Sequence, residues 1–373
     1  MSTQNIIYAT DSYIEIDEFI KDNNIKKIFL VCDNSFQYLN ISHYFKKLKN
    51  SGIEIHCFND FKPNPLYESV VKGVNLFNSN NFDIIIAVGG GSAIDVAKCI
   101  KLYSNMDCTK NYLEQEVVPN DIKLVAIPTT AGTGSEATKY AVIYYNGEKQ
   151  SITDDSCIPS TIIIDISVLS TLPSYQKKST MMDALCHAIE SYWSVNSTDE
   201  SKIYSKKAII LIMQNMDNYI NNDKSSYFNM MEAAYTAGKA INITQTTAGH
   251  ALCYKLTSLY GIAHGHAAIL CISQLWPYMY NRIDKCIDNR GKGYLMETFN
   301  NISLSMNCNT VEEGIEKIKN IIKKLELNVP DMKDESDYEK LVNSVNPVRL
   351  KNNPVELDSK AIDDIYHRIF GGI

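Results

Sequence analysis

The chain changes character at Leu172-Pro173, and this change limits the folds that it can adopt. Before this point, short apolar runs rich in Ile, Val and Phe alternate with stretches of helical period. After it, helical period continues and no β-rich run appears. Alternating buried strands and helices predict a parallel sheet covered on both faces. We therefore expect a Rossmann-like α/β domain over residues 1–172, followed by an all-helical domain over residues 173–373.

The expected strands of the first domain are short and mostly apolar, and they lie within residues 26–33, 53–58, 82–91, 123–130 and 161–165. Residues 141–152 are expected to form a hairpin, because Asn146-Gly147 is typical of a tight two-residue turn.

Composition excludes several classes of function. The net charge is −7 and no long basic run occurs, so a nucleic-acid or membrane-surface partner has little electrostatic support. No stretch of about 18 apolar residues is present, and the N-terminus lacks the basic start and apolar run of a signal peptide. The ten cysteines form no CxxC pair, which predicts buried free thiols in a cytoplasmic protein.

Glycines end one expected strand and open a helix at Gly89, Gly90, Gly91 and Ser92, with Asp95 in the first turn. Glycine allows close approach of a ligand and positive φ, and the N–H groups of a helix start favour an anion. The pattern matches neither of the standard phosphate-binding fingerprints, and an ordinary tight turn is the alternative.

A second loop, containing Thr129, Thr130 and Thr133, follows the next strand at the same sheet edge. Two such loops suit a dinucleotide better than a lone phosphate. Asp33 ends the first of these expected strands. A carboxylate at that position can accept hydrogen bonds from the adenosine ribose and would repel a 2′-phosphate. This predicts NAD(H) rather than NADP(H). The alternative is that Asp33 caps the helix that follows.

Three of the seven histidines fall between Ala248 and Ala267. Asp183 and His187 are four residues apart on an expected helix with apolar neighbours, so they share a face. His250 and His264 are too far apart for one straight helix, but Gly261 between them is expected to break it. One Asp and three His could hold a divalent first-row ion, either Fe²⁺ or Zn²⁺. An exposed Asp–His pair is the alternative. His266 could support a metal ligand from behind, take part in catalysis or simply pack in the core.

Four segments resemble, in order, motifs of the iron-containing (group III) alcohol dehydrogenases: GGGSAIDVAK, IPTTAGTGSEATKYAVI, LPSYQKKSTMMDALCHAIESYWS and AGHALCYKLTSLYGIAHGHA. The resemblance is strong over about residues 25–280 and looser beyond. It implies a dehydroquinate synthase-like architecture, with a dinucleotide-binding domain and then a helical metal-binding domain. It implies the metal ligands Asp183, His187, His250 and His264. It also implies cofactor contacts from the glycine turn, Asp95, the threonine loop and Lys149 of the hairpin.

The chain departs from the family pattern at two positions. Tyr254 stands where many members have a second histidine, and Met181 replaces a usual glycine. The first change puts a histidine proton relay in doubt and makes Tyr254 and His266 the candidates for protonation.

The segments around Tyr254, together with ESYWSVNST and VNPVRLKNNPVEL, resemble the phosphonoacetaldehyde reductase branch. This implies reduction of phosphonoacetaldehyde to 2-hydroxyethylphosphonate, a step of phosphonate biosynthesis. A phosphonate needs cations, and Lys139, Lys255 and Arg349 are the candidates, with simple surface exposure as the alternative for each.

Other functions remain open at this stage. The same reaction could act on sulfoacetaldehyde, a short diol aldehyde or an alkanal. An NAD- and metal-dependent cyclase resembling dehydroquinate synthase is disfavoured, because that family uses a glutamate with two histidines. A non-catalytic binding protein is disfavoured by the complete ligand and glycine motifs. We expect a small-molecule substrate, a homodimer, and no nucleic-acid or membrane partner.

Overall fold

The computed structural model describes residues 4–372. The chain divides into two compact units, Met1–Leu172 and Pro173–Ile373. Among the described residues, no helix is long and apolar enough to span a membrane.

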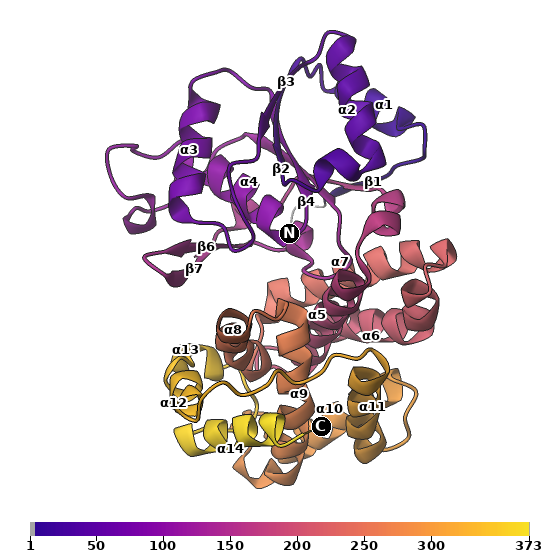
Figure 1. The fold of residues 1–373 in the computed structure, drawn as a ribbon, viewed down its shortest axis with the longest axis vertical. Helices are drawn as coiled ribbons and strands as arrows, with labels where there is room; N and C mark the ends of the chain where they lie inside the picture. Colours follow the sequence, from indigo (N-terminus) through magenta and orange to yellow (C-terminus); the bar gives the residue numbers. More distant parts are fainter. Residues whose placement is uncertain (1–3, 373) are drawn as a thin grey trace. The chain divides into compact units, whose positions relative to one another are not determined.

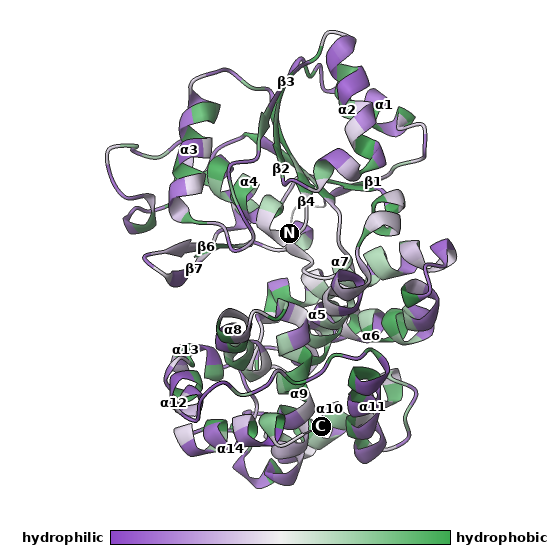
Figure 2. Cartoon of the chain, viewed as in Figure 1, coloured by the Kyte–Doolittle hydropathy of each residue, from purple (hydrophilic) through white to green (hydrophobic). Residues whose placement is uncertain are grey.

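The first unit is built on a six-stranded parallel sheet with the order β1-β8-β5-β4-β2-β3. Its strands are β1 (Asn5–Tyr8), β2 (Lys27–Cys32), β3 (Glu54–Phe58), β4 (Ile84–Gly89), β5 (Lys123–Pro128) and β8 (Thr161–Ile164). Helices α1 (Ile14–Asp22) and α2 (Asn40–Asn50) lie on one face, and α3 (Tyr67–Asn78) and α4 (Gly91–Tyr103) lie on the other (Figure 1). Because both faces are covered, the central strands β2 and β4 are apolar apart from Lys27 at the start of β2, and Figure 2 shows them as hydrophobic.

The winding of the sheet changes direction beside β2. The chain moves from β2 outward to β3 and then returns to place β4 on the opposite side of β2. In open α/β sheets, ligands bind outside the carboxyl ends of the strands at such a point. Asp33 follows β2 there, and Gly90 follows β4.

A hairpin of β6 (Tyr140–Tyr145) and β7 (Glu148–Thr153) accompanies the sheet. Its turn has positive φ at both Asn146 and Gly147, as a type I′ turn requires, so this prediction is confirmed. Strand β1 was not expected. It has four residues, lies at the sheet edge and is only partly buried, so it lacks the long apolar run that marks the other strands.

The second unit is helical. Its helices are α5 (Ser174–Trp193), α6 (Asp199–Ile220), α7 (Tyr227–Thr244), α8 (Ala248–Tyr260), α9 (His264–Asn281), α10 (Gly291–Ser305), α11 (Val311–Lys324), α12 (Ser336–Asn343), α13 (Pro347–Leu350) and α14 (Ser359–Phe370). Helix α5 packs against α6, α7 and α9, and it is buried all round from Met181 to Trp193. The predicted helix break is present, because Gly261 ends α8 with φ 71° and α9 begins at His264.

All ten cysteines are free thiols. Most of them are buried, as expected, but Cys57 and Cys108 are exposed and Cys286 is half-buried.

Candidate metal and cofactor sites

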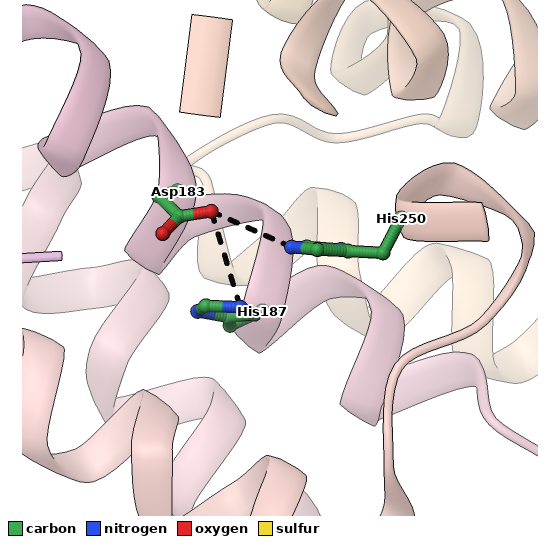
Figure 3. A group of neighbouring side chains, drawn as sticks. All are labelled: Asp183, His187 and His250. Carbon is green, nitrogen blue, oxygen red and sulfur yellow. Dashed lines mark ion pairs between the residues drawn. The ribbon is translucent and has the colours of Figure 1, made fainter. Parts of the chain in front are cut away.

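Three side chains of the second unit converge on one point. Asp183 and His187 project from the same face of α5, and His250 projects from the first turn of α8 (Figure 3). Asp183 Oδ1 lies 3.4 Å from His250 Nε2 and 3.9 Å from His187 Nε2. All three residues are buried, and one ligand atom from each lies within 4.8 Å of the others.

His264 approaches the same carboxylate from the start of α9. Its Nε2 lies 3.9 Å from Asp183 Oδ1, and its ring lies 5.3 Å from the ring of His250. The His264 side chain is 37% exposed, against 7% or less for the other three residues of the group. The side of the cluster occupied by His264 is therefore the side open to solvent.

The cluster suits a divalent ion. Asp183 Oδ1 and His250 Nε2 are buried and have no hydrogen-bond partner among the described residues, although they face each other. Their separation of 3.4 Å is longer than the donor–acceptor distance of an ordinary N–H···O hydrogen bond. Ligand atoms that bind one ion at about 2.0–2.2 Å lie roughly 3–4 Å apart. One carboxylate and three imidazoles form a donor set that fits Fe²⁺ or Zn²⁺.

The charges of the cluster attract a cation. Burial acts to raise the pKa of the Asp183 carboxyl, but His187 and the other two histidines lower it well below its ordinary value. Burial acts to lower the pKa of His250, yet Glu190 and Asp183 together raise it to about 10. The buried carboxylates of Asp183 and Glu190 thus stabilise positive charge at the cluster, and a divalent ion would supply that charge.

Glu190 is a functional residue that the sequence analysis missed. It lies on α5 three residues after His187, is fully buried, and accepts a short hydrogen bond from His250 Nδ1. Its other oxygen accepts from the backbone N–H groups of Thr247 and His250 at 3.0 and 3.2 Å. A carboxylate behind a histidine orients the ring and leaves Nε2 for the metal. The i, i+3 spacing from His187 on an apolar helix was the available signal.

Close packing brings α9 to α5. A Cβ on Gly265 would lie 2.1 Å from Ser179 O and 2.7 Å from Asp183 Cβ. Only glycine fits at this contact. Because His264 precedes Gly265, the contact places His264 close to Asp183.

Tyr254 and Arg349 lie beside the open side of the cluster. The Tyr254 ring stacks on His264 with centroids 5.5 Å apart and an interplanar angle of 8°. Arg349 Nη1 donates to Tyr254 Oη at 3.3 Å, and its guanidinium lies 5.4 Å from the ring centroid. Two of the residues predicted for protonation and anion binding therefore meet next to a predicted ligand.

His266 has partners on both ring nitrogens. Its Nε2 lies 3.0 Å from the carbonyl of Asn328, which can only accept, so Nε2 donates. Its Nδ1 then accepts from Tyr175 Oη at 3.0 Å. Burial lowers the pKa of this histidine, in keeping with a neutral ring. These bonds favour the packed alternative for His266 over a catalytic role.

The two other candidate cations for the substrate differ in setting. Lys139 belongs to the first unit and forms an ion pair of 3.7 Å with Asp155. Lys255 is a half-buried residue of α8, next to Tyr254 in sequence.

The glycine turn of the first unit packs against the threonine loop. A Cβ on Gly91 would lie 3.0 Å from Thr133, one on Gly90 would lie 3.5 Å from Thr130, and one on Gly89 would lie 2.5 Å from Ala93. Thr129 N donates to Gly89 O at 3.1 Å, which ties the two loops together. Positive φ was given as one reason for these glycines, and this was wrong, because none of the three adopts it. Close approach is what they provide.

Asp95 faces the protein. Its two oxygens accept from Ser135 Oγ at 2.6 Å and from Val142 N at 3.0 Å. Lys98 Nζ, fully buried, donates to the carbonyls of Ser135, Thr138 and Tyr140. These bonds give Asp95 a structural role behind the threonine loop, which differs from the direct cofactor contact that the resemblance implied.

Lys149 lies on β7 opposite Tyr144, close enough for its charge to act on the Asp95 carboxyl. Asp33 lies beside the glycine turn, since a Cβ on Gly89 would be 3.2 Å from its Oδ2. Its Oδ1 accepts from Ser35 N and Oγ, so Asp33 holds its own turn rather than capping α2. Asp33, the glycine turn and the threonine loop thus share the carboxyl edge of the sheet.

Comparisons with known proteins find matches to both units of the chain. The family model of iron-containing alcohol dehydrogenases matches residues 3–166, and the model of the C-terminal region of that family matches residues 177–370. The NAD-dependent methanol dehydrogenase of Bacillus methanolicus is 31% identical over 284 residues, which cover 73% of this chain and 72% of that protein. The phosphonoacetaldehyde reductase of Streptomyces viridochromogenes is 28% identical over 295 residues, which cover 75% and 74%.

Solved structures confirm the predicted fold class. The sulfoacetaldehyde reductase of Bifidobacterium kashiwanohense in complex with NAD⁺ has a TM-score of 0.86 at 24% identity, covering 99% of this chain and 98% of that one. The chain spans only 36% of the aldehyde-alcohol dehydrogenase 2 of Entamoeba histolytica, to which it is 29% identical over 324 residues. Both family models match, one on each unit, and together they cover most of the sequence. The chain belongs to the iron-containing alcohol dehydrogenase family.

Proposed function

We propose that this chain is a metal- and NADH-dependent aldehyde reductase whose substrate is phosphonoacetaldehyde, with 2-hydroxyethylphosphonate as the product. The observation that carries the proposal is the buried Asp183–histidine cluster whose one open ligand, His264, is stacked on a tyrosine held by an arginine. The cluster suits a carbonyl oxygen, and the arginine suits an anionic group on the same small molecule.

Asp183, His187, His250 and His264 would hold the ion. When bound, the ion supplies a Lewis acid that polarises the aldehyde carbonyl. Glu190 keeps His250 Nε2 turned toward the cluster, and Gly265 keeps His264 close to Asp183. The residues around the ion are thus set before any substrate arrives, as catalysis by preorganised charge requires.

The carboxyl edge of the first unit is where NADH would bind. The N–H groups after Gly90 and the hydroxyls of Thr130 and Thr133 suit a pyrophosphate, and Asp33 suits the ribose. When bound, the dihydronicotinamide would provide the hydride that an aldehyde carbonyl carbon needs. The relative named as NAD-dependent and the relative solved with NAD⁺ support this cofactor.

Tyr254 is our proposed proton donor. A phenol with an ordinary pKa near 10 is protonated at neutral pH, so it can donate but is a poor base. This suits aldehyde reduction, in which the developing alkoxide must gain a proton. Arg349 beside the phenol oxygen adds a positive charge, and a neighbouring cation stabilises the anion that remains after donation.

Arg349 is our proposed anchor for the phosphonate. Within residues 4–372 it makes no ion pair with a carboxylate, in contrast to Arg290 and Arg368. Its segment is held in place, because Asn352 binds both Gln245 and Asn196 through its side chain. A fixed guanidinium without a counter-ion suits two oxygens of a phosphonate. The name of one relative, a phosphonoacetaldehyde reductase, agrees with this substrate.

An aldehyde panel with NADH on metal-reconstituted protein tests the proposal. We expect the highest kcat/KM for phosphonoacetaldehyde, a lower value for sulfoacetaldehyde and the lowest for propanal. Arg349→Gln should raise the KM for phosphonoacetaldehyde about tenfold or more, since a charge-assisted bond contributes about 1.5–3 kcal/mol, and should leave the KM for propanal unchanged.

Arg282→Gln is the matched control, because Arg282 also lies over a tyrosine, Tyr278, but is exposed at the end of α9. Propanal turned over as well as phosphonoacetaldehyde by the wild type would contradict the substrate. The reductase activity itself would still stand in that case. Ten free cysteines fit a reducing compartment, so we also propose a cytoplasmic location.

A further inference from the structure

One buried thiol lies directly behind the metal cluster. Cys253 is on α8, three residues after His250, and it is fully buried. Its Sγ lies 3.3 Å from the carbonyl of His250 and 3.5 Å from His264 Nδ1. Through these two contacts Cys253 joins α8 to His264, the first residue of α9.

The chemistry of these partners favours one arrangement of the protons. A carbonyl can only accept, so the Cys253 thiol is the donor toward His250 O. With the thiol hydrogen directed there, the sulfur can accept from His264, and the ring hydrogen then lies on Nδ1. A neutral imidazole with hydrogen on Nδ1 has a lone pair on Nε2, and this is the atom that faces Asp183 at 3.9 Å.

The arrangement parallels the one at His250. There the Glu190 carboxylate accepts from Nδ1 and leaves Nε2 toward Asp183. His264 has more need of such a partner, because its side chain is 37% exposed and it begins a helix that follows a glycine turn. The Tyr254 ring, next to Cys253 in sequence, covers the face of the same imidazole.

We propose that Cys253 is a positioning residue that holds His264 as the Nδ1–H tautomer with Nε2 directed at the metal. The proposal rests on the metal site of the proposed function. It predicts that the sulfur matters as a hydrogen-bond acceptor, so a hydroxyl in its place should work and a methyl should not.

Zinc affinity and histidine tautomers test the proposal without any turnover. We would prepare Cys253→Ser, Cys253→Ala and, as a control, Cys271→Ala, which removes another fully buried thiol from neighbouring α9. Loss of a partner behind a ligand histidine weakens metal binding by about 10- to 100-fold. Competition with a chelator should therefore show this loss in Cys253→Ala, and changes below about threefold in Cys253→Ser and Cys271→Ala.

Proton–nitrogen correlation spectra of metal-free protein labelled with ¹⁵N-histidine should show His264 as the Nδ1–H tautomer in the wild type and in Cys253→Ser. Cys253→Ala should show a mixture. Circular dichroism of each variant distinguishes misfolding from a local loss of metal affinity.

The proposal is overturned if Cys253→Ala binds zinc as tightly as Cys271→Ala. It is equally overturned if Cys253→Ser loses as much affinity as Cys253→Ala, because the acceptor would then not be what matters. A wild type that binds no zinc and no iron would instead contradict the metal site on which this proposal rests.

Discussion

Asp33 shows how one carboxylate can serve both the fold and the ligand. One oxygen binds Ser35 within its own turn, while the other lies beside the glycine turn where a ribose would be. The predicted alternative to the ribose contact was a cap on the following helix, and Asp33 does not cap α2, so the second oxygen is left toward the glycine turn.

Asp33→Gly should therefore shift the cofactor preference. Removing the charge takes away the repulsion of a 2′-phosphate and the acceptor for the ribose hydroxyls. We expect kcat/KM to rise by about tenfold for NADPH and to fall for NADH, as one charged contact of about 1.4 kcal/mol gives. Asp60→Gly, which removes an exposed carboxylate that binds Lys72, is the control. A wild type that already prefers NADPH would contradict the placement of Asp33 at the ribose.

At the scale of elements, the metal cluster depends on how α9 meets α5. Gly265 allows contact between the two helices next to His264, and a methyl group there would collide with the backbone of Ser179. A change of rotamer cannot relieve this clash, because the added methyl group would collide with a backbone oxygen. Helix α9 would have to move, and His264 would move with it.

Gly265→Ala should lower both stability and metal affinity. Overpacking typically costs about 1–3 kcal/mol of unfolding free energy, and thermal unfolding would report it. Zinc binding should weaken at least tenfold, because one ligand is displaced. Gly293→Ala is the matched control, since Gly293 lies in α10 with nothing within 4 Å of its added Cβ and should be neutral or slightly stabilising. Equal metal affinity in the two variants would show that the contact does not place His264.

The sequence predicted these elements where the pattern was local. The apolar strands, the Asn146-Gly147 turn and the break at Gly261 follow from period and turn chemistry, and the structure has all three. Strand β1 was missed because its burial depends on pairing with β8, which is distant in the sequence.

The same limit applies to the predicted site residues. Asp183 and His187 share a helix face, so their meeting could be foreseen from spacing. The inward orientation of Asp95 toward Ser135 and Val142, and the two partners of His266, arise from tertiary contacts that no local pattern encodes. Glu190 was overlooked because its spacing from His187, although a signal, does not identify its partner on α8.

At the scale of the whole molecule, each unit carries one half of the proposed chemistry. The first presents Asp33, the glycine turn and the threonine loop at the carboxyl edge of its sheet. The second holds the Asp183–histidine cluster, Tyr254 and Arg349. One family model matches each unit.

The central claim is that Asp183, His187, His250 and His264 bind one divalent ion, and metal content measured by mass spectrometry tests it most directly. We expect about one equivalent of iron or zinc per chain in the wild type, and loss of most of it in His264→Ala, because a four-ligand site loses one donor. His367→Ala removes an exposed histidine that stacks on Tyr338, and it should keep the full content. A full equivalent of metal in purified, folded His264→Ala would contradict the account.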